Sequence, residues 1–459
     1  MAGILFCAVA MVACFAAGYR SLVKGLCALM TVGYAYGIIR ANLPQPAMHF
    51  VFDAGVAGLY IALFTRGATS AQWSRIKVVQ PWLTLLIGWP VVLFFLPVQE
   101  PLVQLVGLRG QIYFLGFVLI GAMLEPEDCY SLARWFAVLN LMAFGFAIAE
   151  YFKGVPAFYP RNANTAIIYS SNDVLRSGAF YRIPAVFVNS AAYSGMMVGA
   201  VPLLLGAWSQ RRAGWGHFYL LTAALVATGL GVFMGASRTW AVILVLTLGG
   251  AFIMGHLSVK VIIRSVIAIA CVGWIVAHNP RLQRFTTLNN ANYVEERIHG
   301  SVNESFFNAL TDYPMGNGLG GGGTSMPFFL QGRVHNPIEI ENEYGQILLE
   351  QGIPGLLIWI GFLLWVFTSP LPRRDAGWML TLKLLRLFLP ISFLSASIGT
   401  GFLTAIPQTS LMLMFVGLYT TARIAQRNFE TARPRGGPSD RCKLIGSWTG
   451  RVGESASVS

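Results

Sequence analysis

The sequence predicts an all-α polytopic membrane protein with about 12–13 transmembrane helices and a long external loop near its C-terminal third. The prediction starts from composition. The chain has 459 residues and a mean hydropathy of +0.61, with 55% hydrophobic and only 11% charged residues. A soluble domain usually carries about 25% charged residues. This chain cannot surround a core with a charged surface, so lipid must be much of its solvent.

Apolar runs recur from the first residues to about residue 427, which predicts one membrane domain, residues 1–427. A bilayer core about 30 Å thick needs roughly 20 apolar residues per helix. The first run lacks the basic segment of a signal peptide, so we expect it to be retained as a helix. The predicted helices are residues 3–19, 22–39, 50–65, 78–98, 105–124, 130–152, 186–208, 217–236, 239–255, 261–278, 353–368, 384–403 and 409–425.

The basic residues lie mostly between the apolar runs. They give a net charge of +13, from 32 Lys and Arg against 19 Asp and Glu. This placement indicates topology signals rather than nucleic-acid binding. Alternation through the helices from a cytoplasmic C-terminus puts every basic stretch inside and the N-terminus outside. These stretches are residues 20–24, 66–77, 211–212 and 373–386, followed by a tail, residues 428–459, which we expect to be basic, cytoplasmic and disordered.

The same alternation places two long segments outside, residues 153–185 and residues 279–352. The second is much the longest polar stretch, and a long loop in a compact fold is usually functional or disordered. It mixes aromatic, aliphatic and charged residues with glycine turns, so we expect a folded external cap. The chain has no visible internal repeat, and the late placement of the long loop argues against two matched transporter halves.

Nothing in the sequence indicates a cofactor. Of the six cysteines, four lie inside apolar runs and two in segments expected in the cytoplasm, without metal-ligand spacing. We therefore expect no disulfide and no metal site. The glycine-rich stretch 313–323 is not followed by the Gly-Lys-Ser/Thr of a nucleotide-binding loop, and a flexible turn accounts for it better.

Several arginines are expected at the outer membrane surface. Arg238 lies between two apolar runs with almost no connecting loop, and Arg161, Arg176 and Arg182 lie in the first external segment. The guanidinium fork matches phosphate oxygens, so these residues are candidates for binding an anionic lipid head group. The alternatives are a snorkelling Arg238 and a solvated loop face for the others.

The last part of the long loop carries the candidates for proton transfer. Imidazole and carboxylate groups can accept a proton from a sugar hydroxyl. Glu339 and Glu343 fit a structural role as well, because acidic residues at a helix N-terminus complement the helix dipole. The polar residues of this stretch are Arg333, His335, Asn336, Glu339, Glu341, Asn342 and Glu343.

Three landmarks, in their order and spacing, resemble the bacterial O-antigen ligase/polymerase family. The first is Ser237-Arg238 between two predicted helices, and the second is the Asn-Ala-Leu-x-Asp-x-Pro-x-Gly-x-Gly-x-Gly run at residues 308–320. The third is Asn342-Glu343-Tyr344, with Gly-Ile-Pro-Gly at residues 352–355. Residues 182–189 also resemble the family's Arg…Phe-x-Asn segment. The resemblance covers about residues 182–364.

The resemblance implies a metal-independent glycosyltransferase of the bacterial inner membrane, with the long loop in the periplasm. Its donor would be a glycan on undecaprenyl diphosphate, and its acceptor a second lipid-linked glycan or lipid A-core. The resemblance also implies that Arg238, with Arg182 or Arg161, contacts the diphosphate. Arg333, Asn336 and Asn342 are further candidates for substrate binding.

One departure from the family pattern leaves the catalytic base open. In ligases a His immediately precedes the Asn that corresponds to Asn342, whereas here that position is Glu341 and the nearest histidine is His335. Either His335 or Glu341 is therefore expected to be the base, since a carboxylate also serves in inverting sugar transfer. The departure favours a surface-polysaccharide polymerase over a lipid A ligase.

Two other classes of function stay open. A transporter or flippase of polyprenyl-linked sugars would use charges within the membrane, and Asp53, Arg109, Glu150 and Arg264 are candidates. Asp53 and Arg109 fit a structural pair equally well. A membrane scaffold would instead tolerate substitutions at His335, Glu341 and Arg238.

Overall fold

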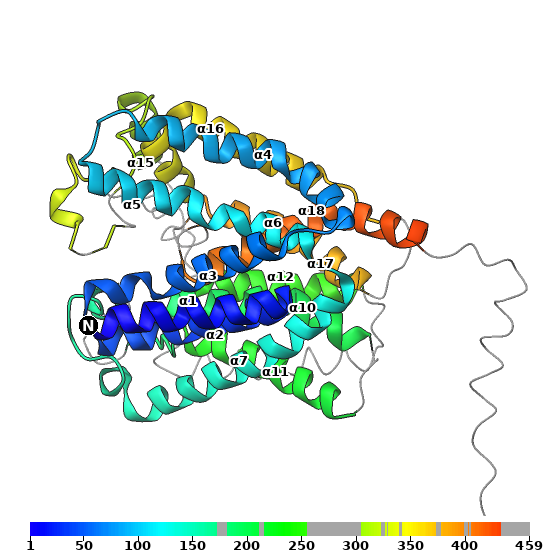
Figure 1. Cartoon of the computed structure of the whole chain (residues 1–459). Helices are drawn as coiled ribbons and strands as arrows, with labels where there is room; N and C mark the ends of the chain where they lie inside the picture. The colour runs from blue at the N-terminus through cyan, green and yellow to red at the C-terminus, as the bar shows by residue number, and fades with distance from the viewer. Residues whose placement is uncertain are drawn as a thin grey trace, which may run out of the picture.

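The computed structural model describes residues 1–171, 181–210, 215–254, 304–322, 326–327, 329–338, 342–372, 378–398, 403 and 405–432. Within these ranges, helices running along one long axis form an elongated bundle (Figure 1). Nine of the described helical segments are long and apolar enough to cross a membrane. The protein is therefore an all-α polytopic membrane protein, as the sequence predicts.

The first helices pack closely through glycines. Helices α1 and α3 lie side by side, and a Cβ atom on Gly58 would come within 2.1 Å of the Met11 carbonyl oxygen. Small residues of this kind let the backbones of membrane helices approach each other. The elements of this part are α1 (Ala2–Arg20), α2 (Leu22–Asn42), the 3-10 turn η1 (Pro46–Phe50) and α3 (Val51–Arg66).

The following elements differ from the prediction mainly at their ends. Helix α4 starts eight residues before the predicted residue 78, because Thr69 and Gln72 form a capping box that begins the helix in a polar stretch. The predicted helix 105–124 is divided into three pieces. The elements are α4 (Ser70–Phe94), α5 (Pro101–Ile112), η2 (Tyr113–Leu115), α6 (Gly116–Met123), α7 (Pro126–Lys153) and η3 (Val155–Ala157).

Except for α8 and α15, which lie in the expected external segments, the remaining helices form where apolar runs predict them, with larger shifts at the start of α16 and the end of α17. Helix α16 starts at Glu343, ten residues before the predicted residue 353, so the end of the expected loop is helical. The predicted helix 261–278 lies outside the described residues. The elements are α8 (Ala166–Ser171), α9 (Ser190–Gly199), α10 (Val201–Ser209), α11 (Trp215–Met234), α12 (Arg238–Met254), α15 (Glu304–Asp312), η6 (Gln331–Arg333), α16 (Glu343–Thr368), α17 (Met379–Ser395) and α18 (Gln408–Ala432).

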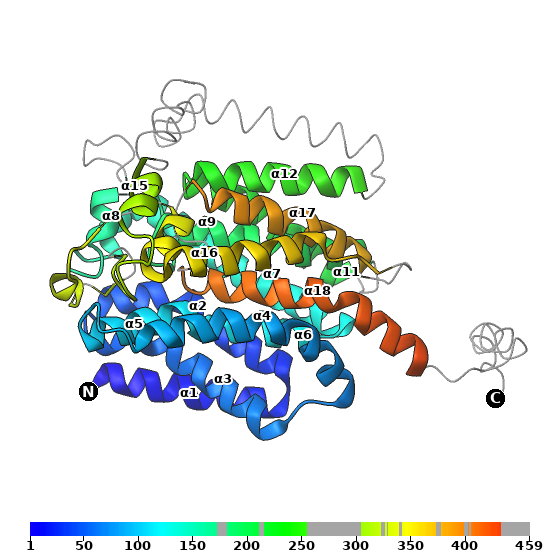
Figure 2. The same ribbon diagram turned by 90° about the horizontal axis from the view of Figure 1, so that it is seen from above.

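Two ends of the bundle can be distinguished. The start of α1, helix α15 and the first turns of α5 and α16 lie at one end, here called the cap end (Figures 1 and 2). The α1–α2 turn, the α3–α4 turn and the last turns of α18 lie at the opposite end, here called the tail end. The basic stretches 20–24 and 66–77 are therefore at the same end as the end of α18, as the predicted alternation requires.

Buried polar residues connect helices across the bundle. The Tyr34 hydroxyl donates to Asn140 Oδ1 at 2.6 Å, and Asn140 Nδ2 donates to Thr228 Oγ1 at 2.9 Å. These contacts join α2, α7 and α11. Arg109 and Asp53, for which the sequence left a structural pair and transport charges equally open, form an ion pair that joins α5 to α3. Side-chain hydrogen bonds of this kind stabilise helix association where hydrophobic burial does not distinguish protein from lipid.

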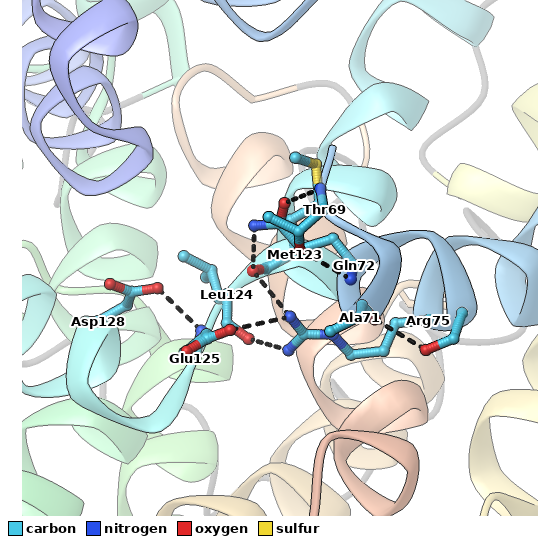
Figure 3. A network of polar contacts seen from close by, with 9 residues as sticks. Thr69, Ala71, Gln72, Arg75, Met123, Leu124, Glu125 and Asp128 are labelled. Carbon is cyan, nitrogen blue, oxygen red and sulfur yellow. Dashed lines mark hydrogen bonds and ion pairs between the residues drawn. The ribbon is translucent and has the colours of Figure 1, made fainter. Parts of the chain in front are cut away.

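At the tail end, Arg75 binds the end of α6 (Figure 3). Its guanidinium donates to the carbonyl oxygens of Leu124 at 2.8 Å and Met123 at 3.4 Å, and it lies 3.4 Å from the Glu125 carboxylate. The last carbonyl groups of a helix have no partner within the helix. Arg75 is only 2% exposed, so it fills this role inside the protein and fixes α4 against the α6–α7 turn.

We expect Arg75→Ala to destabilise the protein by about 1.5–3 kcal/mol, because buried carbonyl oxygens lose a charged donor. Thermal unfolding of the purified protein in detergent measures this as a lower midpoint. Arg66→Ala is the matched control, because Arg66 is an exposed arginine at the same end. Equal midpoints for the two variants would contradict the role of Arg75.

Candidate functional site

Helix α16 is broken near its middle, at the cap end of the membrane region. Asn342 caps its start through Oδ1, which accepts from the backbone N–H groups of Tyr344 at 2.8 Å and Gly345 at 3.2 Å. Gly352 then adopts φ 69° and ψ −175°, and Pro354 follows. Only glycine adopts this conformation readily. The break frees backbone groups that, inside a membrane protein, need other partners.

Residues 313–322, here called the glycine-rich turn, supply those partners. The N–H of Ile353 donates to Pro314 O at 2.9 Å, and the N–H of Asn317 donates to Leu349 O at 2.5 Å. The indole of Trp89, on α4, donates to Gln351 O at 2.9 Å. Two separate sequence motifs, the Pro-x-Gly-x-Gly-x-Gly run and Gly-Ile-Pro-Gly, therefore form one unit in the structure.

Alternate glycines let the turn follow the helix closely. Gly316, Gly318 and Gly320 have φ of 86°, 82° and 80°, which L-residues with a side chain rarely adopt. A Cβ atom on Gly316 would lie 2.9 Å from the backbone nitrogen of Gly352. The flexible turn expected from the sequence is thus an ordered structure that requires glycine for both conformation and space.

Glu350 is a buried residue that binds the backbone of the glycine-rich turn. Its side chain is 1% exposed and accepts from Gln111 Nε2 at 2.8 Å and Gln346 Nε2 at 3.2 Å. The backbone N–H groups of Gly320 and Gly322 also bond to it. These four donors match the acceptor capacity of a carboxylate group. Sequence reasoning missed Glu350, although an acidic residue two positions before Gly-Ile-Pro-Gly in an apolar run was a usable signal.

A cavity of about 60 Å³ lies between α5, the first half of α16 and the start of α18. That volume holds a few water molecules or part of a hydroxylated ligand. Arg109, at its edge, is paired with Asp53. Polar side chains therefore line a buried space in a mostly apolar bundle, and they are Arg109, Gln111, Glu343, Gln346, Glu350 and Thr409.

The α4–α5 turn fixes the backbone at His335. Gln99 donates from Nε2 to Asn317 O at 2.8 Å and to His335 O at 3.0 Å, and its Oε1 accepts from His335 N at 2.8 Å. The imidazole of His335 is exposed, while its backbone is held in one place. Gln99 was not predicted, because its partners are more than 200 positions away in the sequence.

The neighbours of His335 have partners of their own. Arg333 forms an ion pair with Glu100 at 2.6 Å. Asn336 has φ 50° and donates from Nδ2 to the Tyr313 hydroxyl at 2.7 Å. These contacts, with the capping role of Asn342, give three of the predicted substrate-binding residues a structural function. Glu341 lies outside the described residues, as do Glu339, Arg176 and Arg264.

A second group of predicted residues surrounds the starts of α9 and α12. Arg182 is half-buried in the segment that leads into α9, and Arg238 is half-buried in the first turn of α12. Gly195 of α9 lies against both Trp240 of α12 and Gln408 of α18. Helix α12, which begins with Arg238, and helix α9, which follows the Arg182 segment, therefore meet at the start of α18, where Thr409 lines the cavity.

Tyr159 orders the segment that carries Arg182. Its hydroxyl lies 2.7 Å from Ala185 O and 2.8 Å from Phe187 O, and Glu150 accepts from Ala185 N at 3.0 Å. Burial raises the pKa of Tyr159 well above its ordinary value, so this hydroxyl stays a neutral donor. Arg161, in contrast, is exposed and lies with its guanidinium 4.9 Å from the centre of the Tyr169 ring.

The fold and these contacts define a polytopic α-helical membrane protein with an ordered glycine-rich turn at the cap end. A scan against protein-family models finds none that matches this chain, and a search of curated proteins finds no match either.

We expect Gly352→Ala to destabilise the protein by roughly 1–3 kcal/mol, because a side chain is strained in this conformation. Its Cβ atom would also lie 2.7 Å from the Met315 carbonyl carbon. The measurement is thermal unfolding in detergent. Gly88→Ala, in the middle of α4 with no atom within 4 Å of the added methyl group, is the control. A Gly352→Ala variant that is as stable as the Gly88→Ala control would contradict the assignment.

Gln99→Leu should free residues 329–338 from the α4–α5 turn, because it removes both hydrogen bonds to the backbone of His335, as well as one to Asn317. Hydrogen–deuterium exchange should then be faster in these residues and unchanged in α1–α3. Gln72→Leu, at the tail end, is the matched control. Unchanged exchange in Gln99→Leu would show that other contacts fix His335.

Proposed function

We propose that this protein transfers an undecaprenyl-diphosphate-linked glycan to an acceptor hydroxyl at the cap end of the bundle. The observation that carries the proposal is the joining of the glycine-rich turn to the break in α16. It supports an ordered turn at the end of the bundle where α12 begins with the half-buried Arg238 (Figure 2). A transferase needs such order, because reacting groups must be held in fixed positions.

Arg238 is proposed to bind the diphosphate of the donor, together with Arg182 or Arg161. Breaking the bond between sugar and diphosphate leaves negative charge on the leaving group. A preorganised guanidinium at that place stabilises the charge in the transition state. A lipid-linked donor would enter sideways from the bilayer, which suits arginines at the ends of membrane helices.

His335 or Glu341 is proposed to take the proton of the acceptor hydroxyl. The exposed imidazole of His335 on a fixed backbone supports the first choice, since a general base must reach its proton within hydrogen-bond distance. The acceptor is proposed to be a second lipid-linked glycan, as in a polysaccharide polymerase. Lipid A-core is the alternative, as in an O-antigen ligase. No metal or nucleotide takes part in the proposed reaction.

The proposed location is the bacterial inner membrane, with the cap end in the periplasm and the C-terminus in the cytoplasm. The basic turns near Arg20 and Arg66 lie at the tail end with the end of α18. Short cytoplasmic loops are enriched in Lys and Arg, which supports this orientation.

A transporter of polyprenyl-linked sugars is the second candidate, and the broken helix α16 favours it. Discontinuous helices near the middle of the membrane often bind substrates or ions in transporters. Here, however, the carbonyl groups of Leu349 and Gln351 at the break already bind Asn317 and Trp89. Because the protein's own residues already bind these carbonyl groups, the break supports the transferase over the transporter.

Arg238→Ala should lower transfer by about 100-fold or more, the usual cost of removing a group that stabilises transition-state charge. The assay uses the purified protein in liposomes with an undecaprenyl-diphosphate-linked oligosaccharide. The lipid-linked products are followed by gel and mass spectrometry. His335→Ala and Glu341→Ala identify the base by which of them loses transfer.

Arg66→Ala, an exposed arginine at the opposite end, should transfer as the unchanged protein does. Normal chain growth by well-folded Arg238→Ala would refute the proposed mechanism. Movement of the lipid-linked glycan across the bilayer without any longer product would favour the transporter.

A further inference from the structure

Arg40 is a half-buried cation near the end of α2 that has no carboxylate partner among the described residues. Its guanidinium donates to Asn164 O at 3.4 Å and lies 5.9 Å from the centre of the Tyr36 ring. A partly desolvated charge without a counter-ion is unfavourable unless water or a ligand compensates it. Neither its position nor its sequence context had indicated a function.

The segment that follows α7 is bonded to this end of α2. Asn162 donates from Nδ2 to Ala41 O at 2.8 Å, and Asn42 donates from Nδ2 to Phe158 O at 3.0 Å. Asn164, which is 5% exposed, donates to Arg40 O at 3.0 Å. The residues on either side of Arg161 are therefore bonded to the end of α2 that carries Arg40.

Arg161 also has no carboxylate partner in the described part of the chain. Its guanidinium lies over the Tyr169 ring and 3.4 Å from the Tyr181 hydroxyl. Stacking on an aromatic ring orients a guanidinium and leaves its N–H groups at the edge available to an anion. The guanidinium groups of both arginines therefore lie over tyrosine rings.

Among the described residues, the acidic side chains Asp53 and Glu150 have other partners. Asp53 is paired with Arg109, and Glu150 accepts from the backbone of Ala185. His49, whose Nε2 lies 3.0 Å from Asn164 Oδ1, is within electrostatic range of both Arg40 and Arg109. The end of α2 therefore carries positive charge that the described protein does not neutralise.

We infer that Arg40 and Arg161, positioned by Asn164 and Asn162, bind the oxyanion of a phosphate or diphosphate group. The group would belong to a lipid in the adjacent leaflet or to a soluble anion, and the guanidinium fork suits either. The identification of the ligand with the donor's diphosphate rests on the proposed function. The binding site itself rests only on the contacts above.

The test is binding to the purified full-length protein in detergent, measured by native mass spectrometry with geranylgeranyl diphosphate as the probe. Arg40→Gln and Arg161→Gln should each weaken binding by about tenfold or more, the usual effect of losing one charge-assisted hydrogen bond. Arg66→Gln removes the same charge at the tail end and should leave the affinity unchanged. Arg40→Lys should retain part of it, which separates charge loss from misfolding.

The two sources of the anion are distinguished by measuring the binding of geranylgeraniol, which lacks the diphosphate, and of inorganic diphosphate, which lacks the lipid. Strong binding of inorganic diphosphate would identify a soluble anion, and binding of the lipid diphosphate alone would identify a lipid head group. Equal affinities for the unchanged protein, Arg40→Gln and Arg161→Gln would overturn the inference, as would equal weakening by Arg66→Gln. Normal transfer by Arg238→Ala would refute the proposed function without affecting this result.

Discussion

The structure of the cap end depends on one constraint, which is that the backbone groups at the break in α16 must be paired. A helix inside a membrane protein normally satisfies its own N–H and C=O groups, so an interruption needs partners from elsewhere. Here they come from the glycine-rich turn and from Trp89. The turn cannot move away without leaving the carbonyl of Leu349 unpaired, and α16 cannot straighten without displacing the turn.

This interdependence extends to the rest of the cap end. Glu350 ties the turn to Gln111 of α5, and Gln99 ties both Asn317 and His335 to the α4–α5 turn. The contacts form one polar network around elements that are distant in sequence. Such a network is stable only when each buried member has a partner, so it specifies one arrangement of the cap.

The sequence predicted the helices well, because apolar runs of bilayer length rarely form anything except membrane helices. It misplaced the start of α16, since Glu343, Gln346 and Glu350 look like loop residues until their polar cavity is known. The Asp53–Arg109 pair was predictable as opposite charges in neighbouring apolar runs. The role of Gln99 was not, because a lone glutamine in a turn carries no signal of its partners.

Arg75 at the tail end and the pair Arg40 and Arg161 at the cap end are held in different ways. At the tail end, Arg75 is buried against carbonyl groups and Glu125, so the protein itself compensates its charge (Figure 3). At the cap end, Arg40 and Arg161 are held over tyrosine rings without a carboxylate among the described residues. In the proposed orientation the cap end is outside, where the bias of Lys and Arg toward cytoplasmic loops does not account for them. Binding of an anionic ligand at the cap end explains both arginines, because the ligand compensates the charge of each.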